Sequence, residues 1–306
     1  MDNQKIILEL ESGQILIGNS FGYHGSTSGE LVFQTGITGY NETLTDPSYA
    51  NQLIVFTTPL INNYGIPDVN KQNNYDLLEY YESNKPVCSA VIVQEYTVNS
   101  SHYLNFKNHD YEMYTLNLWL KKNNIIGLSN IDTRYLTKII REEGVCRARI
   151  YPTNSNINNL IDFKNINDEN LVNKVSCLNK IEYKSKNNIK NNDNNNNVDI
   201  NNDKNNKIKP KILFFDCGAK NNQLNCILNN NVDIDRVPYN YNITIEEIVN
   251  TYNGIFISNG PGNPEKMTYL IDLIEKIIKQ KIDIPIFGIC LGHQILGISA
   301  GFKIPK

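Results

Sequence analysis

The sequence has no apolar run approaching the roughly 18 residues that span a bilayer, and its start lacks a secretory signal. In place of a basic flank and a continuous apolar stretch, the first residues include Asp2, Glu9 and Glu11. Basic residues are not concentrated either: 29 Lys and Arg stand against 32 Asp and Glu, a formal net charge of −3. We therefore expect a cytoplasmic protein with neither a membrane nor a nucleic acid as partner.

The sequence also has no pair of cysteines at C-x-x-C spacing, which argues against a structural zinc site, and we expect no metal on this chain. Scattered cysteines without an export signal are typical of free thiols in a reducing compartment, and most such residues are small buried hydrophobes. A catalytic role for one of them therefore requires further context. The six are Cys88, Cys146, Cys177, Cys217, Cys226 and Cys290.

A length of 306 residues, 40% of them hydrophobic, predicts about two domains. Residues 1–152 are predicted to form the first, a mixed β/α domain. A helix is expected around Trp119, and another at 133–142 with Asp132 as N-cap and Gly144 as the stop. Strands are predicted at 6–10, 15–17, 31–34, 53–57 and 87–93.

Residues 153–209 are predicted to form a linker. Within it, 186–207 is dominated by Asn with interspersed Lys and Asp, a composition that cannot bury enough apolar surface to offset the entropy of ordering. We interpret this segment as a disordered insertion. An Asn-rich interaction tract is the functional alternative.

Residues 210–306 alternate strand-like and helix-like segments, which predicts an α/β domain with a mostly parallel sheet. Ligands of such sheets bind at the carboxyl ends of the strands. Two glycine-rich turns, 259–263 and 288–292, lie at such ends. The predicted strands are 211–215, 254–258 and 284–289, and the predicted helices are 244–251 and 266–279.

The strongest chemical signal is the stretch 286–294, IFGICLGHQ, which places Cys290 between Gly288 and Gly292. It has the pattern of a nucleophile elbow, a sharp turn from a buried strand into a helix. The turn crowds the backbone, which explains the glycines two residues before and after the cysteine. The helix N-terminus supplies free N–H groups and partial positive charge near the sulfur, and the Leu291 N–H is placed to bind an oxyanion.

The stretch 288–294 resembles the nucleophile motif of class I glutamine amidotransferases. A second stretch, 258–264 (SNGPGNP), resembles the turn that in this family supplies N–H groups to the glutamine site and its oxyanion. The resemblance assigns that role to Gly260 and Gly262, and it implies that Gln294 holds the substrate. Glycines after a buried strand also allow a ligand to approach the backbone closely.

Two further stretches bear on the family. More weakly, 216–221 resembles the first strand-end motif of the amidotransferases, with Cys217 in place of an aromatic residue, and we interpret Cys217 as a packing residue. In the N-terminal part, 29–40 and 42–49 (GELVFQTGITGY and ETLTDPSY) are similar to the signature of the carbamoyl-phosphate synthetase small chain, as is 132–142. In that family the serine matching Ser48 reaches the glutamine from the N-terminal domain.

The resemblance implies the glutaminase component of carbamoyl-phosphate synthetase. Such an enzyme hydrolyses glutamine through Cys290 and passes ammonia to a synthetase, either a separate large chain or a fused domain. The product, carbamoyl phosphate, serves pyrimidine or arginine synthesis. ATP and Mg belong to the synthetase partner, so no cofactor is expected on this chain.

The family's general base is a histidine far downstream of the nucleophile, accompanied by a glutamate, and His293 does not match it. Only 306 − 290 = 16 residues follow Cys290. We therefore expect 210–306 to be a partial amidotransferase domain without appreciable activity by itself. The alternative function is a catalytically incomplete fragment or a scaffold that binds the synthetase. The remaining histidines are His24, His102 and His109.

Overall fold

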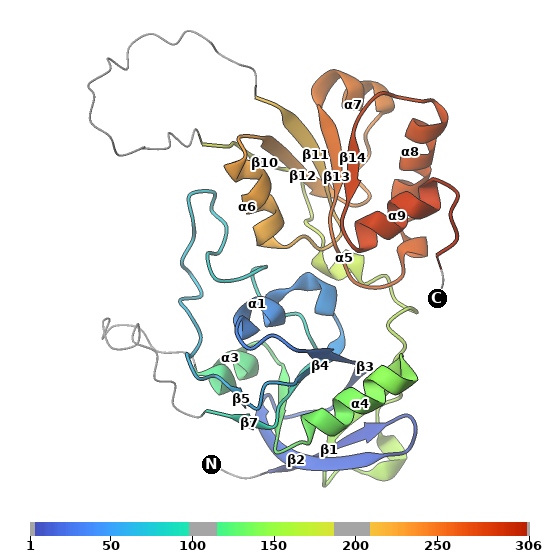
Figure 1. The fold of residues 1–306 in the computed structure, drawn as a ribbon. Helices are drawn as coiled ribbons and strands as arrows, with labels where there is room; N and C mark the ends of the chain where they lie inside the picture. Colours follow the sequence, from blue (N-terminus) through green and yellow to red (C-terminus); the bar gives the residue numbers. More distant parts are fainter. Residues whose placement is uncertain (1–3, 98–114, 187–208, 305–306) are drawn as a thin grey trace, which may run out of the picture. The chain divides into compact units, whose positions relative to one another are not determined.

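A computed structural model describes residues 4–97, 115–186 and 209–304, and the chain divides into two compact units, Met1–Val175 and Ser176–Lys306 (Figure 1). Apart from Lys186, the segment 186–207 lies outside the described residues, so its predicted disorder stays a prediction. Among the helices that are described, none is both long enough and apolar enough to cross a membrane.

The first unit is built on a closed barrel of seven strands in the order β1-β2-β8-β6-β4-β3-β9. The pairs β3–β4, β4–β6 and β6–β8 are parallel, and the other four pairs are antiparallel. A separate parallel pair joins β5 and β7. The strands are β1 Lys5–Leu10, β2 Ile15–Gly22, β3 Thr27–Gln34, β4 Gln52–Phe56, β5 Leu60–Ile61, β6 Ala90–Ile92, β7 Glu95–Tyr96, β8 Ile126–Ser129 and β9 Cys146–Pro152.

Alternation of apolar residues explains the barrel strands. In β1, Ile6, Leu8 and Leu10 are buried in the barrel core, while the residues between them are half-buried. The five strands predicted in this part are confirmed as β1, β2, β3, β4 and β6. Strands β8 and β9 were not predicted: β8 has only four residues, and Arg147 and Arg149 interrupt the apolar pattern of β9.

Helix α4 confirms the predicted helix and both of its ends. The Asp132 side chain accepts a hydrogen bond from the Tyr135 N–H at 2.8 Å, and Gly144 ends the helix at φ 77°. Its apolar face, with Leu136 and Ile140, packs into the barrel core. The helices of this unit are α1 Tyr40–Thr45, η1 Pro47–Tyr49, α3 Leu116–Lys122, α4 Thr133–Glu143, η2 Ile157–Asn159 and α5 Val172–Val175.

The second unit contains the predicted mostly parallel sheet, with strands in the order β10-β12-β11-β13-β14. Only the edge pair β10–β12 is antiparallel. The predicted linker 153–209 is therefore partly structured, since β10 comes from it and adds an edge to the sheet. The strands are β10 Ile181–Tyr183, β11 Lys211–Asp216, β12 Asp233–Pro238, β13 Gly254–Ile257 and β14 Ile286–Gly288.

Helices cover both faces of this sheet: α6 lies on one face, and α8 and α9 lie together on the other (Figure 1). The predicted helices are confirmed as α7 and α8. Helix α6 was not predicted because Asn dominates its sequence, yet it buries Leu224 and Leu228 one turn apart. The helices are α6 Asn221–Asn229, α7 Ile245–Thr251, η3 Pro264–Lys266, α8 Thr268–Lys279 and α9 Leu291–Ser299.

Candidate active site

The sheet topology places the candidate site at the carboxyl ends of its central strands. The chain leaves β11 through α6 to β12 on one side, then passes through α7 to β13 on the other side of β11. Ligands of α/β sheets bind where the strand order reverses in this way. The turns after β11 and β13 meet there, because the Cys217 N–H donates to Ser258 Oγ at 2.9 Å.

The turn after β14 is the sharp elbow that the sequence predicts. Cys290 adopts φ 51° and ψ −109°, a conformation that residues with a side chain rarely adopt. A Cβ on Gly288 would lie 2.5 Å from the carbonyl carbon of Gly292, and one on Gly292 would lie 2.2 Å from the carbonyl oxygen of Ile257. The geometry of the turn therefore requires both glycines.

We expect Gly292→Ala to destabilise the second unit by about 1–3 kcal/mol, because overpacking against backbone atoms typically costs this much. Gly297, in the same helix, is the matched control, since a Cβ there meets nothing within 4 Å. Gly297→Ala is expected to stabilise the helix by up to about 1 kcal/mol. Hydrogen exchange of the β13 and α9 amides measures both effects, and equal exchange in the two variants would contradict the steric requirement.

Exposure separates Cys290 from most other cysteines. Burial raises the pKa of the Cys88 thiol to about 12 and holds that of Cys217 well above its ordinary value. Cys217 is fully buried, which confirms its interpretation as a packing residue. Cys290 and Cys226 are both exposed. They differ in position, because Cys226 lies within α6 and Cys290 lies at the start of α9.

Two backbone N–H groups beside Cys290 are available to a ligand. Among the described residues, no protein acceptor pairs with the N–H of Gly260 or that of Leu291. These residues lie together, because a Cβ on Gly260 would be 2.9 Å from Leu291 Cδ2 and 2.1 Å from the Cys217 carbonyl oxygen. Gly262 has φ 84°, in the left-handed region that favours glycine. Leu291 directly follows Cys290, so the structure packs the elbow of the nucleophile candidate against the glycine turn that carries the second candidate donor.

Gln294 and His293 both lie in the first turn of α9 but differ in environment. Gln294 is half-buried, and its N–H donates to the Cys290 carbonyl oxygen at 3.0 Å, so the two residues lie one helical turn apart. His293 is exposed. Within the described part of the second unit, no hydrogen bond joins the Cys290 thiol to His293.

Ser48 lies in the first unit, and its position is fixed by its own turn. It is half-buried in the short helix η1, and its N–H donates to Asp46 Oδ1 at 2.9 Å. Asp46 is nearly fully buried, so the turn is anchored from inside this unit. Its predicted contact with glutamine stays a prediction.

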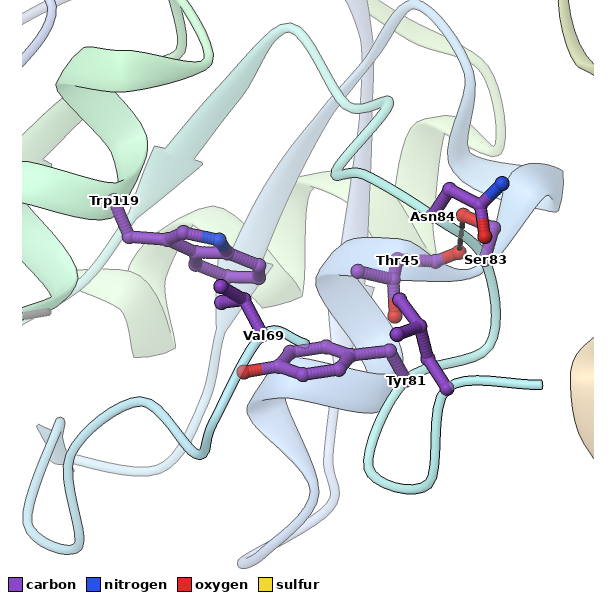
Figure 2. A pocket seen from close by; sticks show the side chains of 7 residues that line it. Thr45, Val69, Tyr81, Ser83, Asn84 and Trp119 are labelled. Carbon is purple, nitrogen blue, oxygen red and sulfur yellow. Dashed lines mark hydrogen bonds between the residues drawn. The ribbon is translucent and has the colours of Figure 1, made fainter. Parts of the chain in front are cut away.

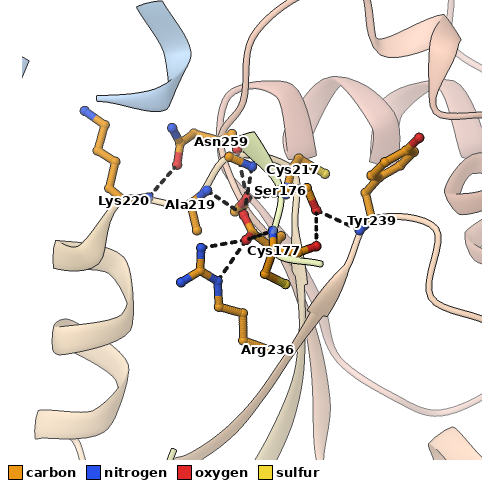
Figure 3. Close-up of polar contacts among 11 residues, drawn as sticks. Ser176, Cys177, Cys217, Ala219, Lys220, Arg236, Tyr239 and Asn259 are labelled. Atoms are coloured by element: carbon orange, nitrogen blue, oxygen red, sulfur yellow. Dashed lines mark hydrogen bonds and ion pairs between the residues drawn. The ribbon is translucent and has the colours of Figure 1, made fainter. Parts of the chain in front are cut away.

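A buried ion pair supports the turn after β11. Asp216, which is fully buried, accepts hydrogen bonds from Arg236 Nε at 2.8 Å and from the Cys177 N–H at 2.8 Å (Figure 3). Its other oxygen accepts from the N–H groups of Gly218 and Ala219, at 2.8 and 2.7 Å. Burial opposes ionisation of Arg236, but the attraction of Asp216 outweighs it and raises the pKa of Arg236. The sequence pattern does not predict this network, because Arg236 lies on β12, a strand that the pattern does not indicate.

A small cavity in the first unit is too small to be an alternative substrate site (Figure 2). Its volume of about 20 Å³ suits one water. The rings of Tyr81 and Trp119 form part of its wall, with centroids 5.7 Å apart. The remaining lining residues are Thr45, Val69, Leu78, Ser83 and Asn84.

The two parts of the chain match two known families. Residues 213–306, which contain the elbow and the glycine turn, match the family "Glutamine amidotransferase class-I", so the second unit belongs to the class I glutamine amidotransferases. Residues 8–150 match "Carbamoyl-phosphate synthase small chain, CPSase domain". The chain therefore belongs to the carbamoyl-phosphate synthase small-chain family.

The chain is similar to two kinds of relative, a multifunctional protein and a small chain. It is 39% identical to "Multifunctional protein pyr1-3" of Dictyostelium discoideum over 100% of this chain and 13% of that protein. It is 33% identical to "Carbamoyl phosphate synthase arginine-specific small chain" of Candida albicans over 98% of this chain and 64% of that protein. The chain thus spans less than two thirds of the length of these relatives.

Proposed function

We propose that this chain is the glutaminase component of a carbamoyl-phosphate synthase, with Cys290 as the nucleophile. One observation carries the proposal: an exposed thiol stands in a strained elbow whose Leu291 N–H is unpaired, and this elbow packs against Gly260, whose N–H is also unpaired. A thiol and two backbone donors at one point are the groups that acyl transfer from an amide requires. Membership of the small-chain family supports glutamine as that amide.

The proposed reaction has two halves. The Cys290 thiolate attacks the carboxamide carbon, and the electron pair of the C=O bond moves to oxygen, where the N–H groups of Gly260 and Leu291 stabilise it. The tetrahedral intermediate then expels the protonated nitrogen as ammonia and leaves a thioester. Water hydrolyses the thioester to glutamate and restores the thiol. We assign substrate binding to Ser48, Gly262 and Gln294.

The proposed partner is a synthetase, separate or fused, that receives the ammonia and combines it with bicarbonate at the expense of ATP. The names of the relatives include both a small chain and multifunctional proteins, which supports both arrangements. In this proposal ATP and Mg bind the synthetase, and the present chain needs no cofactor. The carbamoyl phosphate formed would serve pyrimidine or arginine synthesis.

A catalytically incomplete piece, or a scaffold for the synthetase, is the second candidate. It is favoured by one observation: among the described residues, no histidine is hydrogen-bonded to Cys290. Such a piece would bind the synthetase and yet leave the thiol without a general base.

The proposal predicts selective alkylation of Cys290. In an extended protein, in which residues 1–306 are followed by the rest of the amidotransferase domain of a relative, a glutamine-like electrophile is expected to label Cys290 at least about tenfold faster than Cys226. The reason is that a bound analogue holds its reactive carbon beside the sulfur. Iodoacetamide, which lacks the glutamine group, is expected to label both exposed thiols. Neither reagent is expected to label the buried Cys217. Peptide mass spectrometry measures each rate.

Two comparisons control this experiment. Free glutamine should protect Cys290 and leave the labelling of Cys226 unchanged. Cys226→Ser should leave the Cys290 rate as it is. Equal labelling of Cys226 and Cys290 by the glutamine-like reagent, without protection by glutamine, would show that the elbow is not a glutamine site.

A further inference from the structure

Ser258, which directly follows β13, connects the three turns of the candidate site. It is fully buried, and its N–H donates to the Phe215 carbonyl oxygen of β11 at 3.1 Å. Its hydroxyl oxygen accepts the Cys217 N–H at 2.9 Å, and its carbonyl oxygen accepts the Gly292 N–H of the elbow helix at 3.1 Å. Each polar group of this serine therefore contacts a different part of the site.

The direction of the Ser258 hydroxyl follows from these contacts. Because its oxygen accepts the Cys217 N–H, its hydrogen is free to donate, and the acceptor is the Asn259 carbonyl oxygen at 2.8 Å. The described chain has no cis peptide bond, and in a trans peptide the C=O and N–H groups point in opposite directions. Holding the Asn259 carbonyl toward Ser258 therefore turns the Gly260 N–H the other way.

The space around Gly260 requires this peptide to be well oriented. Gly260 packs closely against the Cys217 carbonyl oxygen and the Leu291 side chain, since a Cβ on it would lie 2.1 Å and 2.9 Å from them. The N–H of Gly260 has no protein acceptor among the described residues. A rotation of the Asn259–Gly260 peptide would turn this N–H away from the direction that the Ser258 hydroxyl fixes.

We propose that Ser258 is a positioning residue whose hydroxyl fixes the Asn259–Gly260 peptide so that the Gly260 N–H can hold the oxyanion. This inference rests on the proposed glutaminase function. The hydroxyl does not contact the substrate; it acts through the peptide it holds. Its loss would also leave the buried Cys217 N–H and Asn259 carbonyl without their partner.

The test is Ser258→Ala in an extended protein, in which residues 1–306 are followed by the rest of the amidotransferase domain of a relative, assayed for glutamine hydrolysis with the synthetase. One oxyanion donor contributes about 10²–10³-fold to kcat, and a donor that is misoriented part of the time should lower kcat by about 10–100-fold. The KM for glutamine should change by less than about twofold, since no binding group is removed. Alkylation of Cys290 by iodoacetamide forms no oxyanion, so its rate should stay unchanged.

Ser299→Ala is the matched control, because Ser299 is also buried in this unit and donates to the Ile295 carbonyl oxygen at 2.9 Å. Its kcat should stay at the wild-type value. An equal loss of kcat in both variants, a raised KM with normal kcat, or slower iodoacetamide labelling in step with kcat would overturn the positioning role.

Ser258→Thr, which keeps the hydroxyl, provides a second measurement if Ser258→Ala is too unstable to assay. Retention of kcat within about threefold would support the role of the hydroxyl. Loss of kcat by Ser258→Thr with normal labelling of Cys290 would overturn it. Absence of glutamine hydrolysis by the extended protein without any substitution would overturn the proposed function and this inference with it. Hydrolysis that Ser258→Ala leaves unchanged would overturn this inference alone.

Discussion

Residues 1–306 alone are expected to hydrolyse glutamine about 10²–10⁴-fold more slowly than an extended protein, since this is the usual contribution of a general acid–base group. Protonation of the departing nitrogen and deprotonation of the deacylating water both need such a group. The one described histidine of the second unit, His293, is exposed on α9 and is not hydrogen-bonded to Cys290.

The measurement is ammonia release by three proteins at equal concentration. They are residues 1–306, its His293→Ala variant, and an extended protein in which 1–306 is followed by the rest of the amidotransferase domain of a relative. We expect the extended protein to release ammonia about 10²–10⁴-fold faster than the short one, and no effect of His293→Ala in the short one. Turnover by the short chain that His293→Ala abolishes would make His293 the base.

The parts of the fold that could be predicted are those set by local pattern. Apolar alternation gave β1, and the Asp132 cap with the Gly144 stop gave α4, because each signal lies within a few residues of the sequence. Barrel closure could not be predicted in this way. It depends on pairing β1 with β9, where Glu9 meets Arg149 across about 140 intervening residues.

The candidate site shows the same division. The motif around Cys290 predicts the elbow because steric crowding is local, and the glycines are where the backbone needs them. The motif around Gly260 predicts that a ligand approaches, but not which way the peptide points. That direction depends on the Ser258 hydroxyl and on the Cys217 N–H, which lies in the turn after β11, some 40 residues earlier. Side-chain direction is a property of the packed unit and is not encoded in residue spacing.

Asp216→Ala is expected to destabilise the second unit by about 3–5 kcal/mol, the usual result of removing one partner of a buried ion pair. The variant would leave the guanidinium of Arg236, whose side chain is 15% exposed, without its carboxylate. It would also leave the N–H groups of Cys177, Gly218 and Ala219 without their acceptor. The destabilisation follows from these unpaired groups more than from the lost attraction.

Hydrogen exchange of the β11 and β12 amides measures the stability of the second unit. Tryptophan fluorescence would not, because the one tryptophan, Trp119, lies in the first unit. Glu275→Ala, which removes the exposed ion pair with Lys279, is the matched control and should cost less than about 0.5 kcal/mol. Adding Arg236→Met to Asp216→Ala should restore part of the stability, since it removes the uncompensated charge. A loss in Asp216→Ala no larger than in Glu275→Ala would mean that the pair does not hold the turn after β11.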